Sequence, residues 1–72
     1  MKRSLEIQIN NVAIRIPCPI CEGLAEPDIG PEVFLSGTRR AVCHECGEEN
    51  DPDLMRELEQ AKADYMVERL TY

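Results

Sequence analysis

Large aromatic side chains are scarce in this 72-residue chain, which has no tryptophan, one phenylalanine and two tyrosines. A chain this short buries only a marginal core, so a metal ion or another cross-link is expected to stabilise it. It has no apolar run near the roughly 18 residues of a membrane-spanning helix, which excludes such a span. The basic start of the chain turns polar at Glu6. No signal-peptide core follows, so a cytoplasmic location is expected.

Basic residues and catalytic groups are also few. Eight lysines and arginines stand against 14 acidic residues, for a formal net charge of −6. Proteins that bind nucleic acid usually carry the opposite sign, so the charge argues against nucleic acid as the main partner. There is no glycine-rich phosphate loop, and no nucleophile or base accompanies the single histidine, His44. We therefore find no catalytic constellation and expect a protein that is not an enzyme.

All four cysteines lie in two Cys-x-x-Cys pairs, Cys18 with Cys21 and Cys43 with Cys46. Four soft thiolates suit tetrahedral Zn²⁺ or iron and leave no open coordination position, so we expect one structural zinc ion. A disulfide framework would need an oxidising compartment. A thioredoxin-like redox site would need a βαβ context and a single pair. His44 could replace a cysteine as ligand, although an exposed side chain is the expected role.

These pairs resemble the zinc-ribbon family over residues 12–48, together with the strands around them and Gly47 directly after the last cysteine. A glycine at that position suits a knuckle because it tolerates positive φ. In the first pair, Gly23 comes one position later than usual. The resemblance implies a metal site and a ribbon fold but no single activity, since zinc ribbons serve in transcription factors, polymerase subunits and docking modules. Rubredoxins hold iron in similar knuckles, but the aromatic core of that family is absent here.

The N-terminal segment predicts a β-hairpin over residues 4–17. Two alternating apolar runs flank Asn10 and Asn11, and asparagine accepts the positive φ of a two-residue turn. That turn would place Ile7 opposite Ile14. The apolar residues that would then share one face are Leu5, Ile7, Ile9, Val12, Ile14 and Ile16.

Residues 18–47 form the predicted zinc-binding ribbon. Residues 22–32 contain four acidic residues and no basic one, which indicates either a solvated loop or an acidic docking surface. A second hairpin is expected after it, with 33–35 and 41–42 as strands and Phe34 opposite Ala41. Arg39 and Arg40 lie at the tip or shoulder of this hairpin. They are candidate nucleic-acid contacts, or ordinary surface arginines.

An amphipathic helix is predicted over residues 51–70. Asp51 suits the N-cap and Pro52 the first helical position. The apolar stripe consists of Leu54, Leu58, Ala61 and Tyr65. Further apolar residues widen it and are our candidate partner-binding residues: Met55, Met66, Val67 and Leu70. At about 30 Å the helix is longer than a ribbon needs as cover, so its remainder could meet a partner or a second copy.

We therefore expect one domain, residues 1–72, of the small α+β class: a zinc ribbon with an N-terminal β-hairpin, a second β-hairpin and a C-terminal α-helix. The expected function is a non-enzymatic zinc-binding protein-interaction module, an acidic adaptor or regulator of a larger protein machine. Two alternatives remain. One is a transcription-associated, nucleic-acid-binding ribbon that uses Arg39 and Arg40, and the other is a rubredoxin-like electron carrier. A homodimer through the C-terminal helix is also envisaged.

Overall fold

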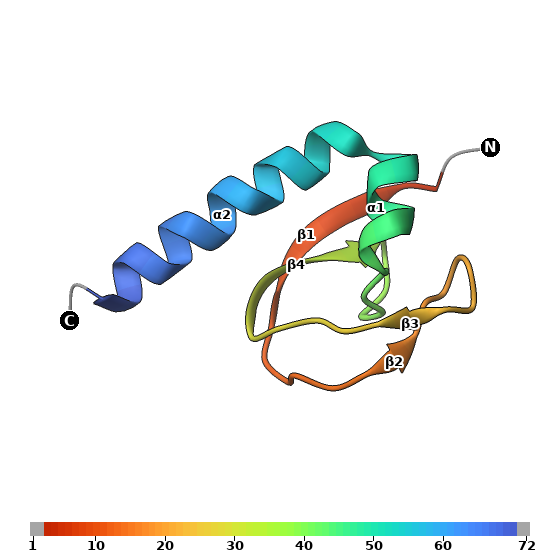
Figure 1. Ribbon diagram of the computed structural model, residues 1–72, viewed down its shortest axis with the longest axis horizontal. Coiled ribbons are helices and arrows are strands. Elements are labelled where there is room, and N and C mark those ends of the chain that lie inside the picture. The colour runs from red at the N-terminus through yellow and green to blue at the C-terminus, as the bar shows by residue number, and fades with distance from the viewer. Residues whose placement is uncertain (1–2, 71–72) are drawn as a thin grey trace.

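Two small antiparallel sheets and two helices make up the fold in the computed structural model, which describes residues 3–70. The elements in chain order are β1 (Leu5–Asn10), β2 (Ile16–Pro17), β3 (Leu24–Ala25), β4 (Gly30–Leu35), α1 (His44–Asn50) and α2 (Pro52–Leu70). One sheet joins β1 to β4 and the other joins β2 to β3. Figure 1 shows the long α2 running alongside β1 and β4, with β2 and β3 at the far side of the molecule. None of the helices in residues 3–70 has the length and apolar character to span a membrane.

The predicted N-terminal hairpin over 4–17 does not form. β1 pairs instead with β4, in a register that places Leu5 opposite Leu35 and Asn10 opposite Gly30. Residues 11–15 are exposed and outside any strand. A local hairpin would have had to find separate cover for its apolar face, whereas the distant pairing creates a face that α2 can bury. Tertiary packing thus overrides the local turn preference of the two asparagines.

One face of the β1–β4 sheet forms the hydrophobic core with α2. The core residues are Leu5, Val33, Met55 and Leu58, with Ile7, Ile20, Leu35, Val42 and Leu54 packed against them. The opposite face carries Phe34, which is only 2% exposed. The guanidinium of Arg39 covers its ring, with Cζ 5.0 Å from the ring centroid. This cation–π contact covers one face of the ring.

The second hairpin has the predicted register. Phe34 forms an isolated antiparallel bridge with Ala41. The amide of Val42 donates to the carbonyl of Val33 at 3.1 Å, and the tip contains Gly37 with φ of 79°. Its first strand is longer than expected, because β4 begins at Gly30 rather than at residue 33.

The predicted helix over 51–70 is confirmed as α2, and a second helix precedes it. Asp51 caps α2, because its Oδ1 accepts the amide hydrogen of Leu54 at 3.1 Å, and Pro52 is the first helical residue. Sequence analysis missed α1. Its residues are mostly polar and include Gly47, a pattern that is typical of a metal knuckle.

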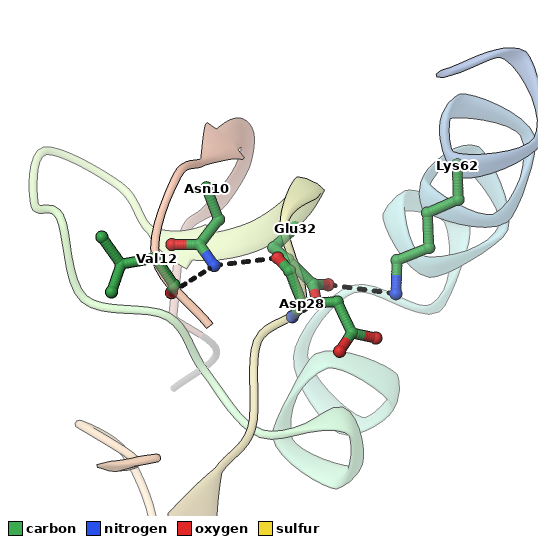
Figure 2. Close-up of polar contacts among 5 residues, drawn as sticks. All are labelled: Asn10, Val12, Asp28, Glu32 and Lys62. Carbon is green, nitrogen blue, oxygen red and sulfur yellow. Dashed lines mark hydrogen bonds and ion pairs between the residues drawn. The ribbon is translucent and has the colours of Figure 1, made fainter. Parts of the chain in front are cut away.

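The segment predicted as an acidic loop is folded against α2, as Figure 2 shows. Glu32 is only 9% exposed, and its Oε1 lies 3.2 Å from Nζ of Lys62 on α2. Its Oε2 accepts the amide hydrogen of Asp28 at 2.7 Å. The side-chain amide of Asn10 donates to the carbonyls of Val12 and Asp28, each at 2.8 Å. These contacts explain why Asn10 ends β1 without starting a hairpin turn, and they join the loop to both β1 and α2.

Candidate metal centre

The first cysteine pair lies in the loop between β2 and β3. These two short strands pair Ile16 with Ala25. The amide of Glu22 donates to the carbonyl of Cys18 at 3.2 Å, and the amide of Cys18 donates to the carbonyl of Gly23 at 2.7 Å. Glu22 has φ of 64° and therefore supplies the left-handed residue that knuckles commonly take from glycine. The turn is thus a regular knuckle in which a glutamate holds the strained position.

The second pair lies at the start of α1 rather than in a loop. Cys43 is the N-cap residue and Cys46 falls in the first turn. Helix N-termini favour negative charge, so this placement suits thiolates. Gly47 is helical, and positive φ occurs in the described residues only at Glu22, Gly30 and Gly37. The expectation that Gly47 needs positive φ is therefore wrong. A Cβ at Gly47 would collide with the side chain of Met55, so glycine allows α1 and α2 to pack closely.

The two pairs meet at one point in space. The sulfur atoms of Cys18, Cys21, Cys43 and Cys46 all lie within 4.8 Å of one another. Sγ of Cys21 is 3.5 Å from Sγ of Cys43, too far for a disulfide bond. Metal–sulfur bonds of about 2.3 Å in a tetrahedron imply sulfur–sulfur distances of about 3.8 Å. The cluster therefore has the dimensions and the donor set to hold one metal ion and is consistent with a zinc knuckle site.

Burial and hydrogen bonding act differently on the thiols. Burial raises the pKa of Cys46 and of Cys43. Burial would also raise the pKa of Cys18, but amide hydrogen bonds from Cys43, Cys21 and Ile20 outweigh it and lower that pKa to about 6. The amide of Cys43 lies 3.4 Å from Sγ of Cys18. Such amide–sulfur bonds stabilise thiolates, and a bound cation would deprotonate the remaining thiols.

The other residues proposed from sequence are not part of this cluster. His44 is exposed and does not belong to it. Arg39 is exposed, and its guanidinium donates to Oε1 of Gln8 and to the carbonyl of Ile9 and lies over the ring of Phe34. Arg40 is exposed and donates to the carbonyl of Pro17 at 3.4 Å. Both arginines are therefore exposed, and each also makes contacts within the chain.

The candidate partner-binding residues of α2 separate into two groups. Met55 is buried in the core, so it offers no surface to a partner. Met66, Val67 and Leu70 are exposed, to 58%, 59% and 78%. Figure 1 shows the end of α2 that carries them extending past the sheets.

Two cavities were not foreseen from the sequence. A cavity of about 310 Å³ lies between residues 22–32 and α2. Its lining includes Glu26, Asp28 and Glu32 on one side, together with Lys62 and Cys43. Another of similar size lies beside the exposed residues Val12 and Ile14. Both depend on long-range pairing, which local sequence patterns did not predict.

No family model, no curated protein and no solved structure matches the chain.

Proposed function

We propose that the protein is a non-enzymatic, zinc-stabilised protein-interaction module that acts as an acidic adaptor or regulator of a larger protein machine. The observation that carries this proposal is the C-terminal end of α2, where Met66, Val67 and Leu70 are exposed. The four thiolates support the non-enzymatic part, because a tetrahedral site filled by protein sulfur has no position for a substrate.

This C-terminal end of α2 begins after Tyr65. The ring of Tyr65 packs against the backbone at Gly30, where an added Cβ would lie 3.1 Å from it. Beyond this contact Met66, Val67 and Leu70 follow at spacings of three and four residues, which place them on one side of a helix. Three exposed apolar side chains at this spacing are typical of a helix that docks in an apolar groove.

The charge of this chain indicates what kind of groove a partner would present to α2. The chain carries a net charge of −6, and Asp64 and Glu68 lie beside Met66, Val67 and Leu70 on one side of α2. A partner with an apolar floor and a basic rim would complement both features. The nucleic-acid alternative is weaker, because a net charge of −6 opposes binding to a polyanion.

The test is a tagged pull-down from native lysate, with and without nuclease, comparing the wild-type chain with Leu70→Lys. Ile14→Lys is the matched control, because Ile14 is also exposed but lies far from α2 in sequence and outside any strand. We expect one stoichiometric protein that survives nuclease, is lost with Leu70→Lys and is retained with Ile14→Lys. Recovery of nucleic acid alone, abolished by Arg40→Ala, would contradict the proposal and favour the nucleic-acid alternative.

A further inference from the structure

The edge of β1 that faces away from β4 presents free backbone groups. In an antiparallel pair, residues that bond to each other alternate with residues whose amides and carbonyls point outward. The amide of Ser36 donates to the carbonyl of Ser4 at 3.0 Å, which makes this a bonded pair. The next pair, Leu5 with Leu35, is therefore an outward-pointing one.

The bonds of β4 on its other side confirm this alternation. The amide of Leu35 donates to Arg40, and the carbonyl of Val33 accepts from Val42, so both groups point away from β1. Their partners across the ladder must point away from β4. We define the outer edge of β1 as the backbone amides and carbonyls of Leu5, Ile7 and Ile9.

The outer edge of β1 is almost without partners. Within residues 3–70 its one hydrogen bond runs from Nη2 of Arg39 to the carbonyl of Ile9, at 3.2 Å. The strand, Leu-Glu-Ile-Gln-Ile-Asn, contains no proline or lysine, and these are residues that commonly protect an edge from pairing. An unprotected six-residue edge is a template for another strand.

We propose that the outer edge of β1 pairs antiparallel with the same edge of a second copy of the chain, forming a symmetric homodimer with one continuous sheet. The two-fold axis passes between the two Ile7 residues, so that Leu5 lies opposite Ile9 of the second copy. In this register every outward amide and carbonyl from Leu5 to Ile9 meets a partner. The carbonyl of Ile9 keeps its bond to Arg39, because a carbonyl oxygen has two lone pairs.

The side chains of β1 favour this register and this occupant. Glu6 is the only charged residue of β1, and it falls opposite Gln8 of the second copy. The carboxylate of Glu6 accepts from Nε2 of Gln8 and from the amide of Gly37 in its own chain, and it would face the neutral amide of Gln8 across the interface. A shift that placed Glu6 opposite Glu6 would oppose like charges, which destabilises a sheet. Leu5 and Ile9 meet on the face that carries α2, and Ile9, 48% exposed, gains cover.

The experiment combines sedimentation equilibrium with amide hydrogen exchange by NMR, on the metal-loaded chain from about 10 μM to about 1 mM. We expect a monomer–dimer equilibrium. The amide of Ile7 should become protected as the dimer forms, whereas the amide of Gln8, which points to β4, should be protected at every concentration. This contrast identifies the edge without any mutation.

Two matched variants test the location of the interface. Ile9→Lys places a charge opposite Leu5 of the second copy and should raise the dimer dissociation constant by at least about tenfold. Ile14→Lys makes the same change at a residue that is 54% exposed but outside β1, and should leave the constant unchanged. A chain that stays monomeric at about 1 mM would overturn the proposal. So would a dimer in which the Ile7 amide stays unprotected, or one that Leu70→Lys dissociates and Ile9→Lys does not.

Discussion

At the scale of single residues, the knuckle and the helix cap depend on backbone conformations that particular side chains favour or oppose. Sequence analysis identified Asp51 as the cap of the helix, because its preference for that position is local and chemical. It also noted that Gly23 comes one position late. The structure supplies the reason, since the left-handed residue is Glu22, with φ of 64°. A non-glycine residue in this region is strained by about 1–2 kcal/mol.

The first prediction concerns this strained position. Replacing Glu22 with glycine removes the clash of Cβ with the backbone, and it also increases the entropy of the unfolded chain. We expect the free energy of unfolding to rise by about 0.5–1 kcal/mol. Urea denaturation at a fixed free zinc concentration measures it. Glu48→Gly is the control, because Glu48 is exposed within α1 and the same substitution there should lower stability by about 1 kcal/mol. A loss at both positions would mean that Glu22 is not strained.

The second prediction concerns the cap of α2. Asp51→Ala removes the oxygen that accepts the amide hydrogen of Leu54, leaving an unsatisfied donor at the helix start. Stability should fall by about 0.5–2 kcal/mol in the same denaturation assay. Asp51→Asn keeps an acceptor at this position and should recover most of the loss. Equal stability of the alanine variant and the wild type would show that the bond contributes nothing.

At the scale of elements, the sequence was informative where an element is local and misleading where pairing is distant. The helix α2 and the Phe34–Ala41 bridge followed from periodicity and short loops. The pairing of β1 with β4 did not. The alternating pattern allows Ile7 to pair with either Ile14 or Val33, and only the packing of α2 on the sheet favours Val33. The two ends of the same helix lie in different environments: Leu58 is in the core, while Leu70 is exposed.

The third prediction separates these two parts of α2. Leu58→Ala should lower the free energy of unfolding by about 2–5 kcal/mol, because it leaves a cavity in the core. Leu70→Ala, at a residue 78% exposed, should change it by less than about 0.5 kcal/mol. Both are measured by urea denaturation with zinc held constant. A large loss at Leu70 would show that the end of α2 is structural and would weaken its assignment as a partner surface.

At the scale of the whole molecule, the four cysteines join parts of the chain that share few other contacts. Cys18 and Cys21 lie between β2 and β3, while Cys43 and Cys46 open α1. The two Cys-x-x-Cys pairs predicted this cluster, because a tetrahedral metal site requires four sulfur ligands and each pair supplies two of them from one tight turn. It could not predict which helix or strand would carry them. The core is small, so a metal ion at this junction would hold the β2–β3 hairpin to the two helices. Structural zinc contributes on the order of 10–16 kcal/mol in small zinc-dependent domains, comparable with the whole stability of an ordinary one.

The most direct test of this metal dependence is a native mass spectrum of the purified chain before and after chelation. We expect one zinc ion for each chain, with few charges on a compact protein. After complete chelation we expect a broad distribution of high charge states, because the metal-free chain should be largely unfolded. A chain purified without metal, or one that keeps its compact distribution after losing it, would contradict the claim that one ion bound by the four cysteines stabilises this fold.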